Sequence, residues 1–143
     1  MRIAVLLALL VTVARADDRL RQYDGQIVIS PDPIPTVSDD LPGFLKAQAA
    51  KDGHYELIKG PPWKINLIGF LSKDPGTTPV KLELAEKGAK TAMHSLDVRA
   101  KGKIVVASTT ATTQAGFEAN KTYVLQLVAG GAVLAKAELL LRN

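Results

Sequence analysis

The last part of the chain limits its possible folds more than any other stretch, because apolar and polar side chains alternate along it. The odd positions from 123 to 127 and from 133 to 141 are apolar, whereas even positions such as Gln126 and Lys136 are polar. A period of two residues is typical of strands that bury one face. These segments therefore predict two long antiparallel strands, separated by Ala129-Gly130-Gly131.

The pairing of these two strands sets the expected length of their turn. Residues opposite each other in a ladder share a face, so odd positions must pair with odd positions, which requires an odd number of loop residues. We therefore expect a three-residue loop over 129–131, with one glycine at positive φ forming a bulge. A shift of one residue would bring Lys136 and Glu138 into the core.

Six further segments carry strand patterns: 26–30, 54–59, 63–71, 80–85, 92–99 and 103–110. The last two predict another hairpin, in which a loop over 100–102 places Leu96 opposite Val106 and Val98 opposite Ile104. Gly/Pro turns separate most of the segments, a spacing that favours a β-sandwich of seven to eight strands.

The N-terminal part differs in character from the rest. Residues 31–35 contain three prolines, which favour an extended connector, with a polyproline-type ligand as the less favoured interpretation. Residues 38–53 predict one short inserted helix, with Asp40 as its cap and Gly53 at its end. We expect a single domain over 17–143, in which 17–53 is extended, proline-rich and helical and 54–143 carries the main strands.

The first 16 residues have the pattern of a signal peptide. Arg2 supplies a positive charge, residues 3–13 are apolar, and Ala14-Arg15-Ala16 matches a cleavage site. The apolar run is shorter than the roughly 20 residues of a membrane span. We therefore expect an exported protein, periplasmic or extracellular, with no membrane span in its mature form.

A short segment before the last hairpin resembles a known family. Phe117-x-Ala119-Asn120-Lys121-Thr122-Tyr123-x-Leu125 is similar to the tyrosine corner of immunoglobulin-like and fibronectin type III-like domains. The resemblance implies an antiparallel immunoglobulin-like β-sandwich, in which Phe117 fills the core and the Tyr123 hydroxyl bonds the corner backbone. It also suggests Trp63 as the core tryptophan. The fold alone implies no function.

Composition excludes several kinds of chemistry. The chain has no cysteine, which rules out disulfides, thiolate metal sites and a cysteine nucleophile. Removal of residues 1–16 takes two of the 18 basic residues and leaves a net charge of +2, with no basic stripe for nucleic acid. Common catalytic motifs are missing from the sequence. We therefore expect no enzymatic activity and no cofactor.

Two functional hypotheses remain. The leading one is an exported module that acts by contact with a protein or an envelope surface, through outward apolar residues: Ile68, Phe70, Val124, Val128, Leu134 and Leu140. In the other arrangement that the sequence allows, residues 31–53 pack over these side chains. The alternative function is a periplasmic carrier of a small ligand or of copper, for which His54, Met93 and His94 are the candidate ligands.

Overall fold

The computed structural model describes residues 20–35, 40–50 and 52–143, and the expected signal peptide lies outside them. The described residues form an all-β fold with nine strands and one α-helix, which confirms the predicted class. The helical elements are η1 (Arg21–Tyr23), a 3-10 turn, and α2 (Leu41–Gln48). The strands are β1 (Gln26–Ser30), β2 (His54–Leu57), β3 (Trp63–Phe70), β4 (Val80–Glu86), β5 (His94–Val98), β6 (Ala100–Lys101), β7 (Ile104–Ala111), β8 (Lys121–Ala129) and β9 (Ala132–Leu141).

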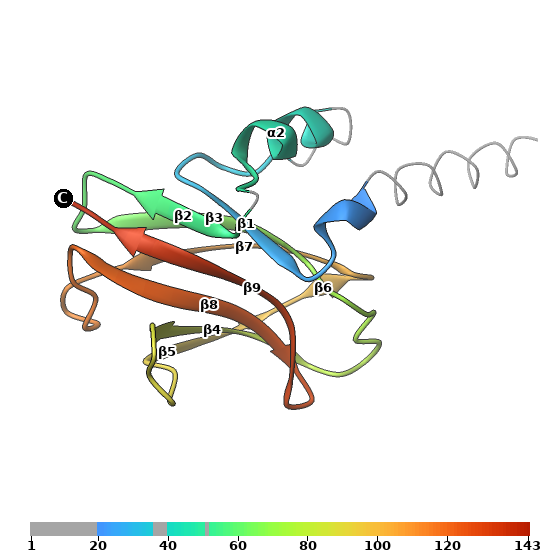
Figure 1. Cartoon of the computed structure of the whole chain (residues 1–143). Coiled ribbons are helices and arrows are strands. Elements are labelled where there is room, and N and C mark those ends of the chain that lie inside the picture. The colour runs from blue at the N-terminus through green and yellow to red at the C-terminus, as the bar shows by residue number, and fades with distance from the viewer. Residues whose placement is uncertain (1–19, 36–39, 51) are drawn as a thin grey trace, which may run out of the picture.

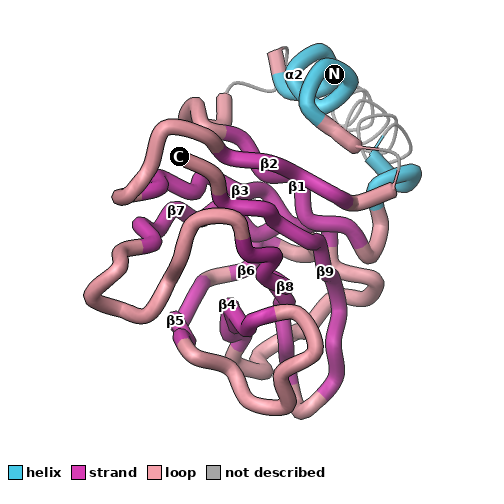
Figure 2. The backbone as a smooth tube through the Cα atoms, turned by 60° about the vertical axis from the view of Figure 1, so that its left-hand side comes forward, coloured by secondary structure: helices cyan, strands magenta, loops and turns pink. Residues whose placement is uncertain are grey.

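All nine strands belong to one strongly curled sheet. Its order is β5-β4-β8-β9-β1-β3-β7-β6, and β2 pairs with β9 outside this path. Figure 1 shows β4, β5, β8 and β9 on one side of the molecule and β1, β3 and β7 on the other. Figure 2 shows the same strands curling around a common centre, so the sheet is nearly barrel-shaped.

The N-terminal strands join the two sides. β1 pairs antiparallel with β3 and meets β9 in parallel at one position, Gln26 opposite Lys136. β2 pairs in parallel with β9, from His54 opposite Glu138 to Leu57 opposite Leu141. The sheet is therefore mixed, and the expectation of a wholly antiparallel one is wrong at these two strands.

The main core lies inside the curled sheet. The strands alternate as the sequence predicts for β4 and β8, where Leu82, Leu84, Leu125 and Leu127 are at most 1% exposed. Complete burial of one such side chain contributes about 1.5–3 kcal/mol of hydrophobic free energy. This core holds both sides of the sheet together.

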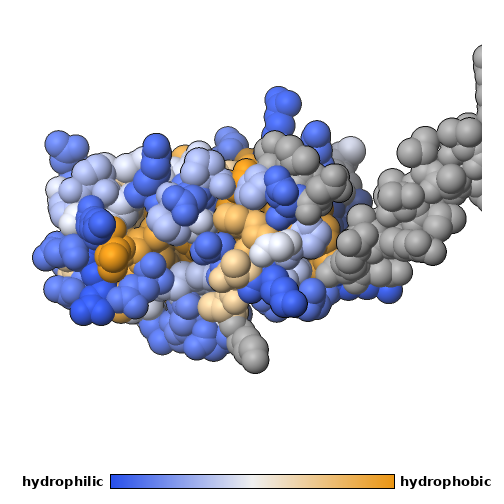
Figure 3. Space-filling model, turned by 90° about the horizontal axis from the view of Figure 1, so that it is seen from above, coloured by the Kyte–Doolittle hydropathy of each residue, from blue (hydrophilic) through white to orange (hydrophobic). Residues whose placement is uncertain are grey.

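A second, smaller core lies on the outer face of β1 and β3. Val28, Ile68 and Phe70 pack there against Leu45 of α2, and Tyr23 of η1 places its ring 5.4 Å from that of Phe70. Ile68 is 1% and Phe70 2% exposed, so the prediction that they form a surface patch is wrong. For these two residues, the structure shows the other predicted arrangement, in which the segment over 31–53 packs over them. Figure 3 shows hydrophobic atoms between hydrophilic ones on this side of the molecule.

The proline-rich connector is fastened to the same face. Ile34 is buried in the second core, and the amide of Asn66 donates a hydrogen bond to the carbonyl of Pro31 at 3.1 Å. These contacts support the interpretation of residues 31–35 as a connector that leads from β1 to α2.

The turn between β8 and β9 differs from the predicted one. Ala129 pairs with Ala132, so the turn contains only Gly130 and Gly131, at φ values of 57° and 78°. A register shift follows at once, because Val128 pairs with Val133 while Leu127 pairs with Ala135. Leu134 is the extra residue, and this bulge restores the odd-to-odd pairing that a three-residue loop was expected to provide.

The predicted hairpin over 92–110 is also wrong. β5 pairs with β4, with Leu96 opposite Leu82, and only the two-residue β6 turns back onto β7, with Lys101 opposite Ile104. The chain crosses from one side of the sheet to the other between Val98 and Ala100. Leu96 can thereby pack against the main core from an edge strand.

The helix is shorter than its sequence signals suggest. α2 begins after Asp40, whose side chain makes no capping hydrogen bond, and Pro42 lies in its first turn. It ends at Gln48 with Ala49 extended at its C-terminus, so the predicted stop at Gly53 lies too far along. Gly53 instead has a φ of 69° and donates its N–H to the Ala50 carbonyl in the turn before β2.

At the corner before β8, Phe117 packs against the ring of Tyr123, and the Tyr123 hydroxyl bonds the backbone of Glu118. Phe117 is 1% exposed, with its ring centroid 5.0 Å from that of Tyr123. The Tyr123 hydroxyl accepts the Glu118 N–H at 2.8 Å. Tyr55 repeats this arrangement, because its hydroxyl accepts the N–H of Ala50, also five residues earlier, at 3.1 Å.

Substitution Tyr123→Phe removes this bond and keeps the ring. We expect the free energy of unfolding to fall by about 0.5–1.5 kcal/mol, the usual net contribution of one hydrogen bond, as measured by urea denaturation. Tyr23→Phe is the control, because its ring contact with Phe70 remains. An unchanged urea midpoint for Tyr123→Phe would show that the corner bond does not stabilise the fold.

Trp63 closes one end of the main core. It is the first residue of β3, is 1% exposed, and donates its indole N–H to the carbonyl of Arg142 at 2.8 Å. A Cβ atom at Gly60 would lie 2.3 Å from the indole ring, so only glycine permits this close approach.

Candidate functional site

The outer surface of β4, β8 and β9 lies away from α2, and the outward side chains of β2 continue this surface beside β9. In Figure 1, among the residues drawn in colour, α2 and η1 lie over the β1–β3 side and no helix lies over β8 and β9. The even-numbered side chains of β8 point outward here, and those of β9 do so after the bulge. We call this surface the open face.

The open face carries half-buried apolar residues beside polar ones. Val124, Val128 and Leu140 point outward and are each partly exposed. Val133 lies opposite Val128 and is 49% exposed. Lys81 lies opposite Val128 on β4, and Gln126 pairs with Lys136 and Glu83. The surface is thus a mixture of short aliphatic and charged side chains.

Leu134 does not belong to this face. The bulge turns it inward, where it is 4% exposed in the main core, so its prediction as an outward contact residue is wrong. Val133 takes the outward place instead. The alternation pattern alone could not identify Val133, because the bulge changes which residues face outward before Ala135 without altering the later parity.

An ion-pair cluster lies beside Val124. Glu138 lies opposite Val124, and its two carboxylate oxygens lie 2.8 Å from Lys87 Nζ and 3.1 Å from His54 Nε2. Lys87 follows β4 and His54 begins β2, so the cluster joins three separate segments of the chain. It fixes the side-chain positions at one end of the open face.

The hydrogen bond from Lys87 lowers the pKa of Glu138 below its usual 4.5, against the effect of burial, and the charges of His54 and Lys136 assist. Because the folded-state pKa is lowered, the stabilisation is present above the unfolded value and is lost as the pH falls through the folded one. We expect the Glu138 carboxyl to titrate below 4.5 by NMR, and this midpoint to rise in Lys87→Met.

The control for that titration is Lys121→Met. Lys121 pairs with Glu86 at 3.4 Å and with Glu118 at 2.9 Å, and not with Glu138. The midpoint of Glu138 should therefore stay at its wild-type value. An equal change in both variants would mean that general surface charge, rather than the Lys87 contact, sets this pKa.

The three candidate metal ligands are not brought together. His54 points outward from β2 toward Glu138, whereas His94 lies on the inner side of β5, 6.5 Å from the ring of Phe117. In the sheet, β4, β8 and β9 lie between β5 and β2. Met93 is 37% exposed, and its methyl lies near Gly116. Among the described residues no group of three histidine or acidic side chains is placed to hold a metal ion.

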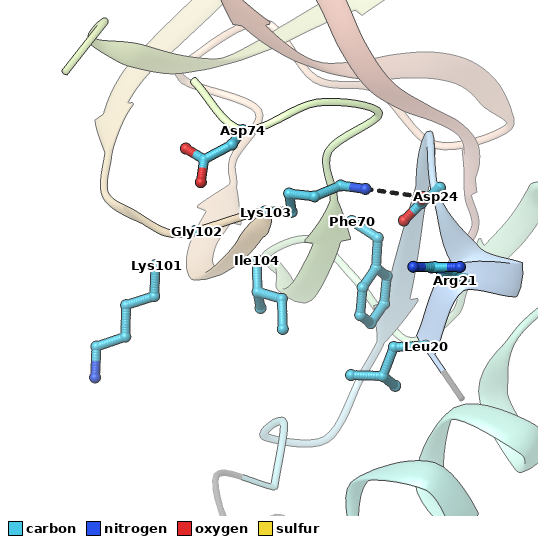
Figure 4. A pocket seen from close by; sticks show the side chains of 9 residues that line it. All are labelled: Leu20, Arg21, Asp24, Phe70, Asp74, Lys101, Gly102, Lys103 and Ile104. Carbon is cyan, nitrogen blue, oxygen red and sulfur yellow. Dashed lines mark hydrogen bonds and ion pairs between the residues drawn. The ribbon is translucent and has the colours of Figure 1, made fainter. Parts of the chain in front are cut away.

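One cleft lies on the other side of the molecule, where η1 meets the β6–β7 turn. Its volume is about 340 Å³, and Leu20, Phe70 and Ile104 form its apolar part. Lys103 reaches across it and pairs with Asp24 at 3.0 Å. Figure 4 shows this pair over the ring of Phe70, whereas Lys101 extends away from the other side chains.

Comparison of the chain with protein families and with curated proteins gave no match. In the part of the chain that the structure describes, no helix combines the length and the apolar character that crossing a membrane requires.

Proposed function

We propose that this protein is an exported, immunoglobulin-like module that acts by binding another protein or an envelope component through the open face. The observation that carries the proposal is that the two sides of the fold differ in how far their outward apolar residues are covered. α2 and the connector bury the apolar residues of β1 and β3, whereas Val124, Val128, Val133 and Leu140 stay accessible among charged residues.

The strand order supports the immunoglobulin-like part of the proposal. In such sandwiches one sheet holds the first, second, fifth and fourth strands, and the other holds the third, sixth and seventh. The run β1-β3-β7-β6 fits the first set, and β5-β4-β8-β9 fits the second with one added strand. Tyr123 lies near the start of β8, the strand that corresponds to the one on which the family has its corner tyrosine. Trp63 departs from the family pattern, because it lies on β3 rather than on β4.

The composition of the open face suits a separable contact. Interfaces between proteins that also exist apart are about as apolar as ordinary surface, with polar groups at their rim. Here the aliphatic side chains lie between the Lys87–Glu138–His54 cluster and Lys81, and ion pairs such as Arg142–Glu56 hold polar side chains in place at one edge. Fixed side chains lose less conformational entropy on binding.

The experiment compares three substitutions of the same kind in a crosslinking pull-down from the native envelope fraction. Val128→Asp and Val133→Asp place a carboxylate among the aliphatic residues of the open face, whereas Ile58→Asp changes an aliphatic residue, 61% exposed, in the loop that follows β2. We expect one stoichiometric partner, whose recovery falls by about tenfold or more in the first two variants. Equal recovery with all three would refute the open face as the binding surface.

The alternative is a carrier of a small ligand, and the cleft at Phe70 favours it. Its volume lies within the usual range for small-molecule sites, and its lining combines an aromatic floor with charged groups. Native mass spectrometry of the protein purified from its own cells should then show a bound small molecule. Ile104→Trp, which fills the cleft, should abolish it.

A further inference from the structure

One edge of the sheet is longer than the strand that covers it. β7 has eight residues, and β6 pairs only with Ile104 and Val105. Within the described ranges, no strand pairs with β7 beyond Val105 on the side away from β3. We call residues 106–111 the free edge.

The backbone directions along the free edge follow from the contact at its start. The N–H of Leu71, the residue after β3, donates to the Lys103 carbonyl at 2.7 Å. The backbone N–H and carbonyl groups of Lys103 therefore point toward β3. The direction of the backbone hydrogen-bonding groups alternates from one residue of a strand to the next. The N–H and carbonyl groups of Val106, Ser108 and Thr110 therefore point away from β3. The side chains of these same three residues are exposed, and Val106 is 50% accessible. Their N–H and carbonyl groups therefore face outward along an accessible edge.

The free edge lacks the usual protection. Proteins protect an exposed edge with charged residues, prolines or bulges, because it otherwise pairs with another strand. From Ile104 to Thr113 the sequence contains no charged residue and no proline. The opposite edge, β5, contains Asp97 and is followed by Arg99. The β5 edge thus carries charged residues that discourage pairing, whereas the free edge carries none.

We propose that two copies of this chain associate through their free edges as an antiparallel strand pair centred on Thr109. Ser108 of one copy then lies opposite Thr110 of the other, twice by symmetry. Both residues point their backbone groups outward, and each such pair exchanges two N–H···O bonds. Centring on Thr109 also keeps the second strand away from β6, which occupies the edge beside Val105.

The free edge fits a second copy of itself. An uncharged edge does not repel its own copy. The pairing places hydroxyl beside hydroxyl, Ser108 with Thr110, on the exposed face, and such pairs stabilise neighbouring strands. The two-fold arrangement closes after two copies, because each free edge is used once.

The test is sedimentation equilibrium of the protein expressed from its full coding sequence and purified as the cell processes it. A small interface predicts weak association, so we expect the dimer fraction to increase between about 10 µM and about 1 mM. Ser108→Lys places a charge on the free edge, and Ser108→Pro removes an N–H that points outward. Both should remain monomeric over this range. Ser95→Lys, on the exposed face of β5, should dimerise as the wild type does.

Hydrogen exchange at both concentrations locates the contact. The amides of Val106, Ser108 and Thr110 should exchange more slowly in the concentrated sample. Circular dichroism of each variant verifies its fold, and two unrelated changes at Ser108 guard against one that misfolds. A wild type that stays monomeric at about 1 mM, or a Ser108→Lys dimer equal to the wild type, would overturn the proposal. A heterocomplex that protects these amides while the isolated chain stays monomeric would assign the edge to another protein's strand and likewise overturn it.

Discussion

Phe117→Ala is expected to lower the free energy of unfolding by about 3–5 kcal/mol. Phe117 is 1% exposed and packs against Tyr123 on one side and His94 on another. Truncation leaves a cavity between β8 and β5. The Tyr123 ring cannot move to fill it, because the Tyr123 hydroxyl is held by the Glu118 N–H. Urea denaturation monitored by circular dichroism measures the change.

Phe44→Ala is the matched control for this prediction. Phe44 lies on α2 and is only partly buried against the second core, so its truncation should cost clearly less than that of Phe117. An equal or larger loss for Phe44→Ala would contradict the assignment of the main core to the inside of the curled sheet.

Leu45→Asp is expected to detach α2 from the sheet. Leu45 is fully buried against Val28, Ile68 and Phe70, and an unpaired carboxylate in that position costs several kcal/mol. Release of α2 costs less than burial of the charge, because few contacts tie the helix to the rest of the fold. We therefore expect strong binding of a hydrophobic dye together with a nearly unchanged strand signal in circular dichroism.

Ala47→Asp places the same charge on the exposed side of α2. It should leave dye binding at the wild-type level, with a small cost from an acidic group near the helix C-terminus. Dye binding by both variants, or by neither, would contradict the covering role that the structure gives to α2.

Local patterns predicted some of the strands well. β1 and β4 lie where the sequence places them, because each is a short apolar or alternating run bounded by glycine or proline. The burial of β3 on both faces has a sequence signal too. Residues 65–71 form a nearly continuous apolar run, which is typical of a strand covered on two sides.

Other features depend on contacts that a local pattern does not contain. Leu134 occupies a bulge, and the pattern after it looks the same as that of a plain hairpin with a longer loop. The alternation along β5 would also fit pairing with β7. Instead β5 pairs with β4, where Leu96 packs against the main core. The Lys87–Glu138–His54 cluster joins three segments, so no spacing in the sequence could reveal it. Of the predicted contact residues, Val124, Val128 and Leu140 lie on the open face, and the bulge adds Val133 to them.

The most direct test of the open face is photo-crosslinking in intact cells from position 128, with position 58 as the control. Both positions are aliphatic in the wild type, but Val128 lies on β8 within the open face, whereas Ile58 lies in the loop that follows β2. The account predicts one crosslinked partner protein from position 128 and none from position 58. Crosslinks of equal yield from both positions, or none from position 128, would contradict binding through the open face.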